Sequence, residues 1–403
     1  MSLYVPDPEG PSPAELIESL GAQLAARYTA AEQVLIEAIA KRAYVILSLQ
    51  ASNEPEARDL LAAQLRLQRL AMARTTALRE LQQIAAREVA RIREEKLAER
   101  LIAEAARYGE AAAAARLKLA RRLPAPAPAS ATASSAVAQL TLDLSSRLET
   151  LNARILRYPQ DAYQQVISET APINLLGGET RLRVQQLAVQ RFLAEGIDGF
   201  TDRADRRWRI GTYAEMAGRT ATQRAYQDAG VWRMQQSGLN LVTVVRGLDS
   251  CKKCAGWSGK ILSTNGDASN VLLPHATDDR MVAVKVDGTV QDARNAGWGH
   301  PNCRCQLVAY LPGLTIPQNA TTYDPQAEAD REKQRAIERG IRAAKRDAVT
   351  APNDIERRRA EREVKELQGE MREFLARTGR KRTSYREQLH FADGSGRRSR
   401  AAE

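Results

Sequence analysis

The chain has 403 residues, enough for two or three domains that each bury a core, and its net charge is +11. Aromatic residues make up only 5%, while Ala, Leu, Arg and Glu dominate long stretches, which favours extended helices over sheet-rich domains. The basic balance suits an acidic partner such as DNA. No apolar run is long enough to cross a membrane and no signal peptide is evident, so we expect a soluble product of the cytoplasm with no membrane partner.

Two long helical patterns predict an N-terminal domain over residues 1–122. The first runs from about residue 13 to 50, with Ser12 as its N-cap, and a Ser-Asn-Glu-Pro run ends it. The second runs from about residue 55 to 122, with Gly109 as its expected division. Apolar stripes of this length need a partner helix, so the sequence predicts a helical hairpin or coiled coil, or a plain helical bundle.

A stretch rich in Pro, Ala and Ser, residues 123–136, is the clearest domain boundary. An alternating Pro-Ala sequence is stiff and extended, and it lacks the large apolar side chains that could form a core. A core domain is predicted over residues 137–323. It begins with helical segments at roughly 136–157, 159–170, 179–196 and 201–237.

The second half of this core is expected to hold a small sheet. The β-branched run Leu239–Arg246 predicts a strand, and residues 307–311 predict another. Residues 255–280, rich in Gly, Ser, Asn and Asp, are expected to form a loop. Residues 281–290 are typical of a hairpin with Asp287-Gly288 at its turn. The fold class is therefore α+β and mostly α, with long N-terminal helices and a helical core that carries a small sheet.

The last region, residues 324–403, reads as a charged helical segment followed by a basic tail. Helices are expected from about residue 325 to 377, with an interruption near Ala351–Asp354. The tail from Gly379 is expected to be disordered. Its arginines could neutralise nucleic-acid phosphates, and a solvated tail is the competing interpretation.

All four cysteines of the chain lie in two short clusters, Cys251/Cys254 and Cys303/Cys305, and His300 lies beside the second. Two close pairs of thiolates are the usual way to surround a tetrahedral Zn²⁺ ion. Residues i and i+2 of an extended strand share a face, so Cys303 and Cys305 are expected to point the same way. The sequence therefore predicts a structural zinc site, with His300 as an alternative ligand or as a group that orients one.

Three other interpretations of the cysteines stay open. They could form disulfides in an oxidising environment, or they could be reduced core thiols packed beside Trp257 and Trp298. A catalytic cysteine would need an activating base and an orienting partner, and no carboxylate stands in an evident third position. A reducing cytoplasm favours metal over disulfides.

The order of these motifs resembles that of a known family. A helix containing Arg219–Tyr226 precedes Cys251-x-x-Cys254, the string His300-Pro301-Asn302-Cys303-Arg304-Cys305 follows, and a charged segment around Gln334–Arg346 comes last. This arrangement, over roughly residues 200–390, resembles the phage minor capsid protein 2 family, which is related to the Mu F-like head morphogenesis proteins.

The resemblance implies a non-enzymatic, structural minor protein of the tailed-phage head, incorporated during procapsid assembly. Expected partners are the portal and the major capsid or scaffold proteins, with packaged double-stranded DNA as a possible contact of the basic tail. The expected location is the virion, in the head interior or portal region. The resemblance also carries over the cysteine and histidine signature, with Arg219 and Arg304 as buried or interface charges.

The runner-up is a zinc-dependent nuclease or toxin-type enzyme carried by a phage, because His300-Pro301-Asn302 beside cysteines resembles treble-clef nucleases. Hydrolysis would need open metal positions and a general base. The other histidines, His275 and His390, have no obvious pairing, so a closed site is expected.

Overall fold

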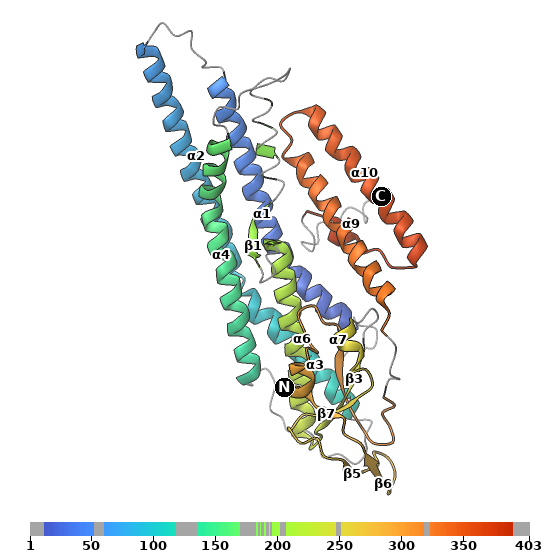
Figure 1. Cartoon of the computed structure of the whole chain (residues 1–403). Coiled ribbons are helices and arrows are strands. Elements are labelled where there is room, and N and C mark those ends of the chain that lie inside the picture. The colour runs from blue at the N-terminus through green and yellow to red at the C-terminus, as the bar shows by residue number, and fades with distance from the viewer. Residues whose placement is uncertain are drawn as a thin grey trace, which may run out of the picture. The chain divides into compact units, whose positions relative to one another are not determined.

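The computed structural model is mostly helical with a few small sheets, which confirms the α+β, mostly α class (Figure 1). The structure describes residues 12–51, 60–117, 135–169, 196–201, 207–246, 251–317 and 323–389, and single positions between 183 and 193. Among these residues, no helix combines the length and the apolar character that crossing a membrane requires.

The long helices precede and follow the sheets in the chain. The helices are α1 (Pro13–Ala51), α2 (Leu60–Glu94), α3 (Leu97–Leu117), α4 (Ser135–Glu169), α6 (Ile210–Gln236), α7 (Lys252–Ala255), α8 (Val290–Asn295), α9 (Pro325–Val349), α10 (Asp354–Thr378) and the 3-10 helix η2 (Ser384–Glu387). The strands are β1 (Asp198–Thr201), β2 (Arg207–Arg209), β3 (Leu241–Val245), β4 (Ile261–Ser263), β5 (Val271–Pro274), β6 (Met281–Val284), β7 (Gly288–Thr289) and β8 (Gln306–Ala309).

The chain forms two compact units, each built from three separate segments. Unit 1 comprises residues 1–24, 96–147 and 214–332, and unit 2 comprises residues 25–95, 148–213 and 333–403. Most of the expected linker, 123–136, lies outside the described residues, as does the basic tail beyond residue 389. The linear domain boundaries therefore stay a prediction.

Unit 1 centres on α6 and a four-stranded sheet in the order β7-β4-β3-β8. Strand β3 pairs antiparallel with both β4 and β8, and its residues Val242 and Val244 are buried. The side-chain amides of Gln223 and Gln227 on α6 both donate to the carbonyl of Cys305, at 3.0 and 2.7 Å. These bonds tie the start of β8 to the helix.

Gly109 does not divide a helix, contrary to the prediction, because it lies inside α3. A Cβ atom at this position would lie 1.9 Å from the carbonyl oxygen of Tyr226 on α6. The glycine thus permits a close crossing of two helices in unit 1. The division between α2 and α3 falls instead at residues 95–96, where Lys96 takes a φ of +44°.

The predicted hairpin over residues 281–290 is wrong. Strand β6 pairs antiparallel with β5, whereas β7 pairs in parallel with β4 of the larger sheet. Asp287 explains the separation, since its backbone N–H donates to the carbonyl of Ile261 at 2.8 Å and its carboxylate accepts from the Ile261 N–H at 3.0 Å. Residues 255–280 accordingly contain two strands rather than one long loop.

The described helix ends follow from local capping. Ser12 and Glu15 form the reciprocal bonds of a capping box at the start of α1, as the sequence predicts. In unit 2, the Asn353 side chain accepts from the N–H groups of residues 355 and 356 and so begins α10. The predicted interruption between α9 and α10 is confirmed.

Helices α9 and α10 lie side by side and bury a small apolar core of their own (Figure 1). Its buried members are Ile337, Ile341, Met371 and Phe374. The chain after Gly379 is described as far as residue 389, and there Glu387 is buried and paired with Arg382 at 2.6 Å. Order therefore extends some residues beyond the point at which disorder was predicted.

Candidate metal centre

The first cysteine pair lies on a tight turn in unit 1, as its spacing predicts. Cys251 directly precedes the single turn of α7, and its carbonyl accepts from the N–H groups of Cys254 and Ala255, both at 3.0 Å. The turn continues with the Trp257 N–H donating to the Cys254 carbonyl at 3.1 Å. Both side chains consequently leave the same short loop.

The second half of the cluster comes from the turn between α8 and β8. Gly299 has a φ of +70° and Asn302 a φ of +65°, left-handed conformations that glycine and asparagine tolerate best. The Cys303 N–H donates to the carbonyl of His300 at 2.9 Å, which closes the turn. The Asn302 N–H donates to the hydroxyl of Thr220 at 3.3 Å, so α6 anchors it.

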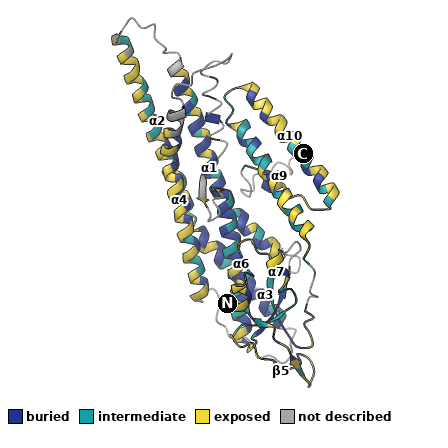
Figure 2. Ribbon diagram, viewed as in Figure 1, coloured by how far each residue is buried: buried dark blue, intermediate teal, exposed yellow. Residues whose placement is uncertain are grey.

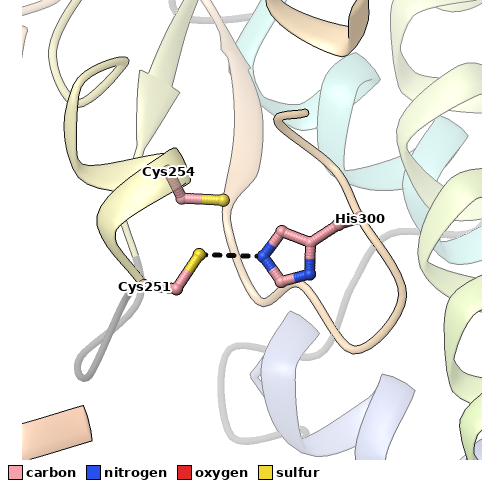
Figure 3. A group of neighbouring side chains, drawn as sticks. All are labelled: Cys251, Cys254 and His300. Atoms are coloured by element: carbon pink, nitrogen blue, oxygen red, sulfur yellow. Dashed lines mark hydrogen bonds between the residues drawn. The ribbon is translucent and has the colours of Figure 1, made fainter. Parts of the chain in front are cut away.

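The structure brings all five predicted residues together. Cys251, Cys254 and His300 form one group whose ligand atoms lie within 4.8 Å of one another (Figure 3). Cys254, Cys303 and Cys305 form a second group by the same measure. Cys254 belongs to both, so the two groups make one continuous cluster.

The Cys254 and Cys303 sulfurs lie too far apart for a disulfide bond and close to the spacing of two ligands of one zinc ion. The Sγ atoms of Cys254 and Cys303 are 3.5 Å apart. Tetrahedral zinc with Zn–S bonds of about 2.3 Å places its sulfur ligands about 3.8 Å apart, whereas a disulfide bond measures about 2.05 Å. All four cysteines are free thiols in this arrangement.

His300 makes one hydrogen bond with each of its ring nitrogens. Its Nδ1 atom lies 2.8 Å from the carbonyl oxygen of Pro301, which can only accept a hydrogen bond. The proton of a neutral imidazole therefore resides on Nδ1, and the lone pair on Nε2 faces the cluster. Nε2 lies 2.9 Å from the Cys251 sulfur (Figure 3). A carbonyl that fixes the tautomer in this way commonly accompanies metal-bound histidine.

The thiols differ in their exposure, and their crowding opposes ionisation. Cys254 and Cys305 are buried, whereas Cys251 and Cys303 are partly exposed. Hydrogen bonding with Cys303 and Cys305, together with burial, raises the pKa of Cys254. A hydrogen bond with Cys254 lowers the pKa of Cys303. The hydrogen bond with Cys305 and burial outweigh this effect, and the net result is a pKa raised to about 12. Several thiolates here need a cation to compensate their charge.

Aromatic side chains cover the cluster. Trp298 is 2% exposed and packs with Cys254 and Cys305 in the hydrophobic core of unit 1. Trp257 packs against the same core, and the Lys260 ammonium lies 4.5 Å from the centre of its ring. The cysteines therefore lie beside both tryptophans, as the interpretation of reduced core thiols requires, and this packing does not decide between that interpretation and a metal site.

The two arginines of the signature belong to a structural ion-pair network. Arg219 is buried and pairs with Glu215 one turn earlier on α6 and with Glu18 of α1, the latter at 3.4 Å. Arg304 is about two-fifths exposed and also reaches Glu18, at 3.8 Å. Sequence reasoning missed Glu18 and Glu215, although the spacing of Glu215 and Arg219 on a helix was a usable signal.

The motif helix Arg219–Tyr226 contains Thr220 and Gln223, but the sequence analysis did not predict that these two residues and Gln227 would bond to the second half of the cluster. Nothing in their spacing marks them, because their partners lie about 80 residues away in the chain. His275 belongs to neither group: its Nδ1 accepts from the N–H groups of Thr277 and Asp278 in its own loop. His390 lies outside the described residues.

Comparison with known proteins extends the resemblance to almost the entire chain. The family model described as phage minor capsid protein 2 matches residues 14–376, from the start of α1 to the end of α10. A search of curated proteins found no match, and a search of solved structures found none either. Because the matched residues include both units and the cysteine cluster, the chain belongs to the phage minor capsid protein 2 family.

Proposed function

We propose that this protein is a structural, non-enzymatic component of the phage head, present in the virion. The observation that carries the proposal is the family match over residues 14–376. The finer part of the proposal is incorporation during procapsid assembly, beside the portal and in contact with the major capsid or scaffold proteins. The resemblance noted above, which relates this family to the Mu F-like head morphogenesis proteins, supports this location. The basic tail, rich in arginine, would contact packaged DNA.

A second part of the proposal concerns the cysteine cluster, which we propose binds one structural zinc ion. Cys251, Cys254 and His300 Nε2, which form one close group, would supply three ligands. Cys303 would supply the fourth; its sulfur lies 3.5 Å from that of Cys254, and zinc binding would draw it toward Cys251 and His300. His300 is favoured over Cys305 because His300 groups with both Cys251 and Cys254, whereas Cys305 groups with Cys254 and Cys303. The Nδ1 contact with Pro301 leaves the Nε2 lone pair of a neutral His300 directed at the Cys251 sulfur. Three cysteines and one histidine are a common structural zinc set.

The role of the zinc would be to join two loops that the chain separates. One loop follows β3 and the other precedes β8, and these two strands are neighbours in the sheet. Metal binding would fix both loops against α6 and contribute directly to folding stability. Four protein ligands would leave no open position for substrate or water, which supports a structural rather than a hydrolytic role.

Quantitative mass spectrometry of purified particles from the source phage tests the head assignment. We expect the chain at a few to tens of copies per particle, together with the portal protein. Absence from particles, with abundant protein in the lysate, would overturn a structural role in the virion and point to an assembly factor or an enzyme. A particle-associated chain that lies far from the portal in cross-linking would contradict only the finer location.

A further inference from the structure

The loop between β4 and β5 contains an asparagine that is followed by a glycine. Asn265-Gly266 is the only pair of this kind in the chain. Residues 265–270, which lead into β5, are all exposed (Figure 2). Gly266 takes a φ of +88°, and a Cβ atom at this position would meet no atom of a distant residue within 4 Å. The bend therefore favours glycine for its backbone conformation, and nothing packs against it.

An asparagine side chain can react with the backbone nitrogen of the residue that follows it. A bond forms between this nitrogen and Cγ, and the bond from Cγ to the amide nitrogen breaks. The amide nitrogen takes the proton of the attacking nitrogen and leaves as ammonia, so that a succinimide ring remains. Water then opens the ring at either carbonyl and gives aspartate or isoaspartate. A following glycine leaves the attacking nitrogen unhindered, because it has no Cβ atom.

A hydrogen bond closes the Asn265 side chain onto this bend. The Asp267 N–H donates to Asn265 Oδ1 at 3.2 Å. The ring that this bond closes contains both the Asn265 Cγ atom and the Gly266 nitrogen, so the two reacting atoms belong to one small turn. The Asn265 N–H donates to Ser263 Oγ at 3.3 Å, which ties the turn to the end of β4.

Two donors converge on the oxygen of the amide that would be attacked. In addition to the Asp267 N–H, the Ser263 hydroxyl donates to Asn265 Oδ1. Ser263 is 1% exposed and pairs with Leu241 of β3, so the sheet holds it in place. Attack on Cγ places negative charge on Oδ1. Hydrogen-bond donors that already point at such an oxygen stabilise this charge, as an oxyanion hole does.

Asn270, at the end of the same exposed stretch, provides a contrast. Its Oδ1 accepts from the Val286 N–H at 3.2 Å. The next residue is Val271, whose β-branched side chain hinders attack by its backbone nitrogen. Asn270 thus shares the loop and the exposure of Asn265, but not its glycine.

We propose that Asn265 is a site of spontaneous deamidation, which Gly266 permits and the Ser263 hydroxyl promotes. The modification adds one negative charge to the link between the four-stranded sheet and the β5–β6 pair. Isoaspartate would also lengthen the backbone of this link by one carbon atom. The inference depends on neither the head assignment nor the zinc site.

Peptide mass spectrometry of the full, purified chain tests the proposal. The protein is incubated at mildly alkaline pH, and the conversion of each asparagine is followed with time, with isoaspartate identified by enzymatic methylation. We expect Asn265 to convert at least about tenfold faster than Asn270. The folded chain should also convert Asn265 at least as fast as the chain in urea does. Asn265 no faster than Asn270, or slower in the folded chain than in urea, would overturn the proposal.

Ser263→Ala tests the hydroxyl. The folded variant should convert Asn265 at least about fivefold more slowly than the parent, because one donor to Oδ1 is lost. Ser269→Ala is the matched control: the Ser269 hydroxyl donates to the Asp267 carboxylate, and its loss should change the rate by less than about twofold. In urea, the parent and both variants should react equally. Equal rates for the folded parent and folded Ser263→Ala, with unchanged circular dichroism, would overturn the role of Ser263.

Discussion

His300 and Cys305 are the two candidates for the last ligand of the proposed zinc site, and only His300 lies in one group with Cys251 and Cys254. His300→Ala should weaken zinc binding by at least about 100-fold, because a ligand is lost, and Cys305→Ala should retain zinc. Zinc content per chain, measured by inductively coupled plasma mass spectrometry after dialysis, distinguishes them. His275→Ala serves as the histidine control. Zinc retained in His300→Ala but lost in Cys305→Ala would reverse the assignment, and a parent chain without zinc would refute the site.

Asp347 in unit 2 provides a test of pH dependence. Partial burial and the nearby charge of Glu363 raise the pKa of Asp347 from 3.8 to about 6, although Arg209 lowers it. The folded protein therefore holds this proton more tightly than the unfolded chain does. The contribution of Asp347 to stability is fully present below pH 4 and is lost as the pH rises toward 6.

Asp347→Asn should accordingly stabilise unit 2 at pH 7 by at most about 1 kcal/mol, allowing for the partial exposure of the carboxylate. The difference from the parent should vanish near pH 3, where both side chains are neutral. Urea unfolding curves at several pH values between 3 and 7, followed by circular dichroism, measure this. A variant that is less stable than the parent at pH 7 would show that the Asp347 charge is favourable.

At the scale of elements, two helical glycines make a matched pair. A Cβ atom on Gly109 of α3 would lie 1.9 Å from the Tyr226 carbonyl, whereas at Gly369 of α10 the nearest atom is the end of the Arg372 side chain at 3.7 Å. Gly109→Ala should cost about 1–3 kcal/mol by forcing α3 and α6 apart. Gly369→Ala should stabilise α10 by about 0.5–1 kcal/mol. Thermal unfolding of both variants checks the pair, and equal effects would contradict the close crossing.

The sequence could predict the features that depend on nearby residues, and it could not predict those that depend on residues far away in the chain. The start of α1 and the break before α10 depend on capping residues within a few positions, and both were predicted correctly. The convergence of the five cluster residues was predictable because cysteine occurs nowhere else in the chain. The strand that pairs with β6 was not predictable from the sequence. The turn residues Asp287-Gly288 favoured a local hairpin, but Asp287 instead bonds to Ile261, which is distant in the chain. The role of Gly109 depended on Tyr226, more than a hundred positions away.

For the whole molecule, the cysteine cluster lies in one unit only, so metal removal should act locally. If zinc joins the loops beside β3 and β8, a strong chelator should lower the melting temperature of the parent chain. Amide hydrogens of β3 and β8 should then exchange faster, while those of α10 in unit 2 should keep their rates. Hydrogen exchange with and without chelator measures both. An unchanged melt in chelator would refute a stabilising metal.

The division of the chain into interleaved units has a consequence for biosynthesis. Unit 1 includes residues as late as 332. Unit 2 includes segments near the beginning, in the middle and at the end of the chain, the last of which contains α10. Neither unit can therefore finish folding while the ribosome is still making the middle of the protein. The long helices of the first hundred residues leave the ribosome early, while their apolar stripes are still exposed. The segments that complete their packing are synthesised last. A stalled or truncated translation product should therefore be prone to aggregation and to capture by chaperones, even when all the residues of α1–α3 are present.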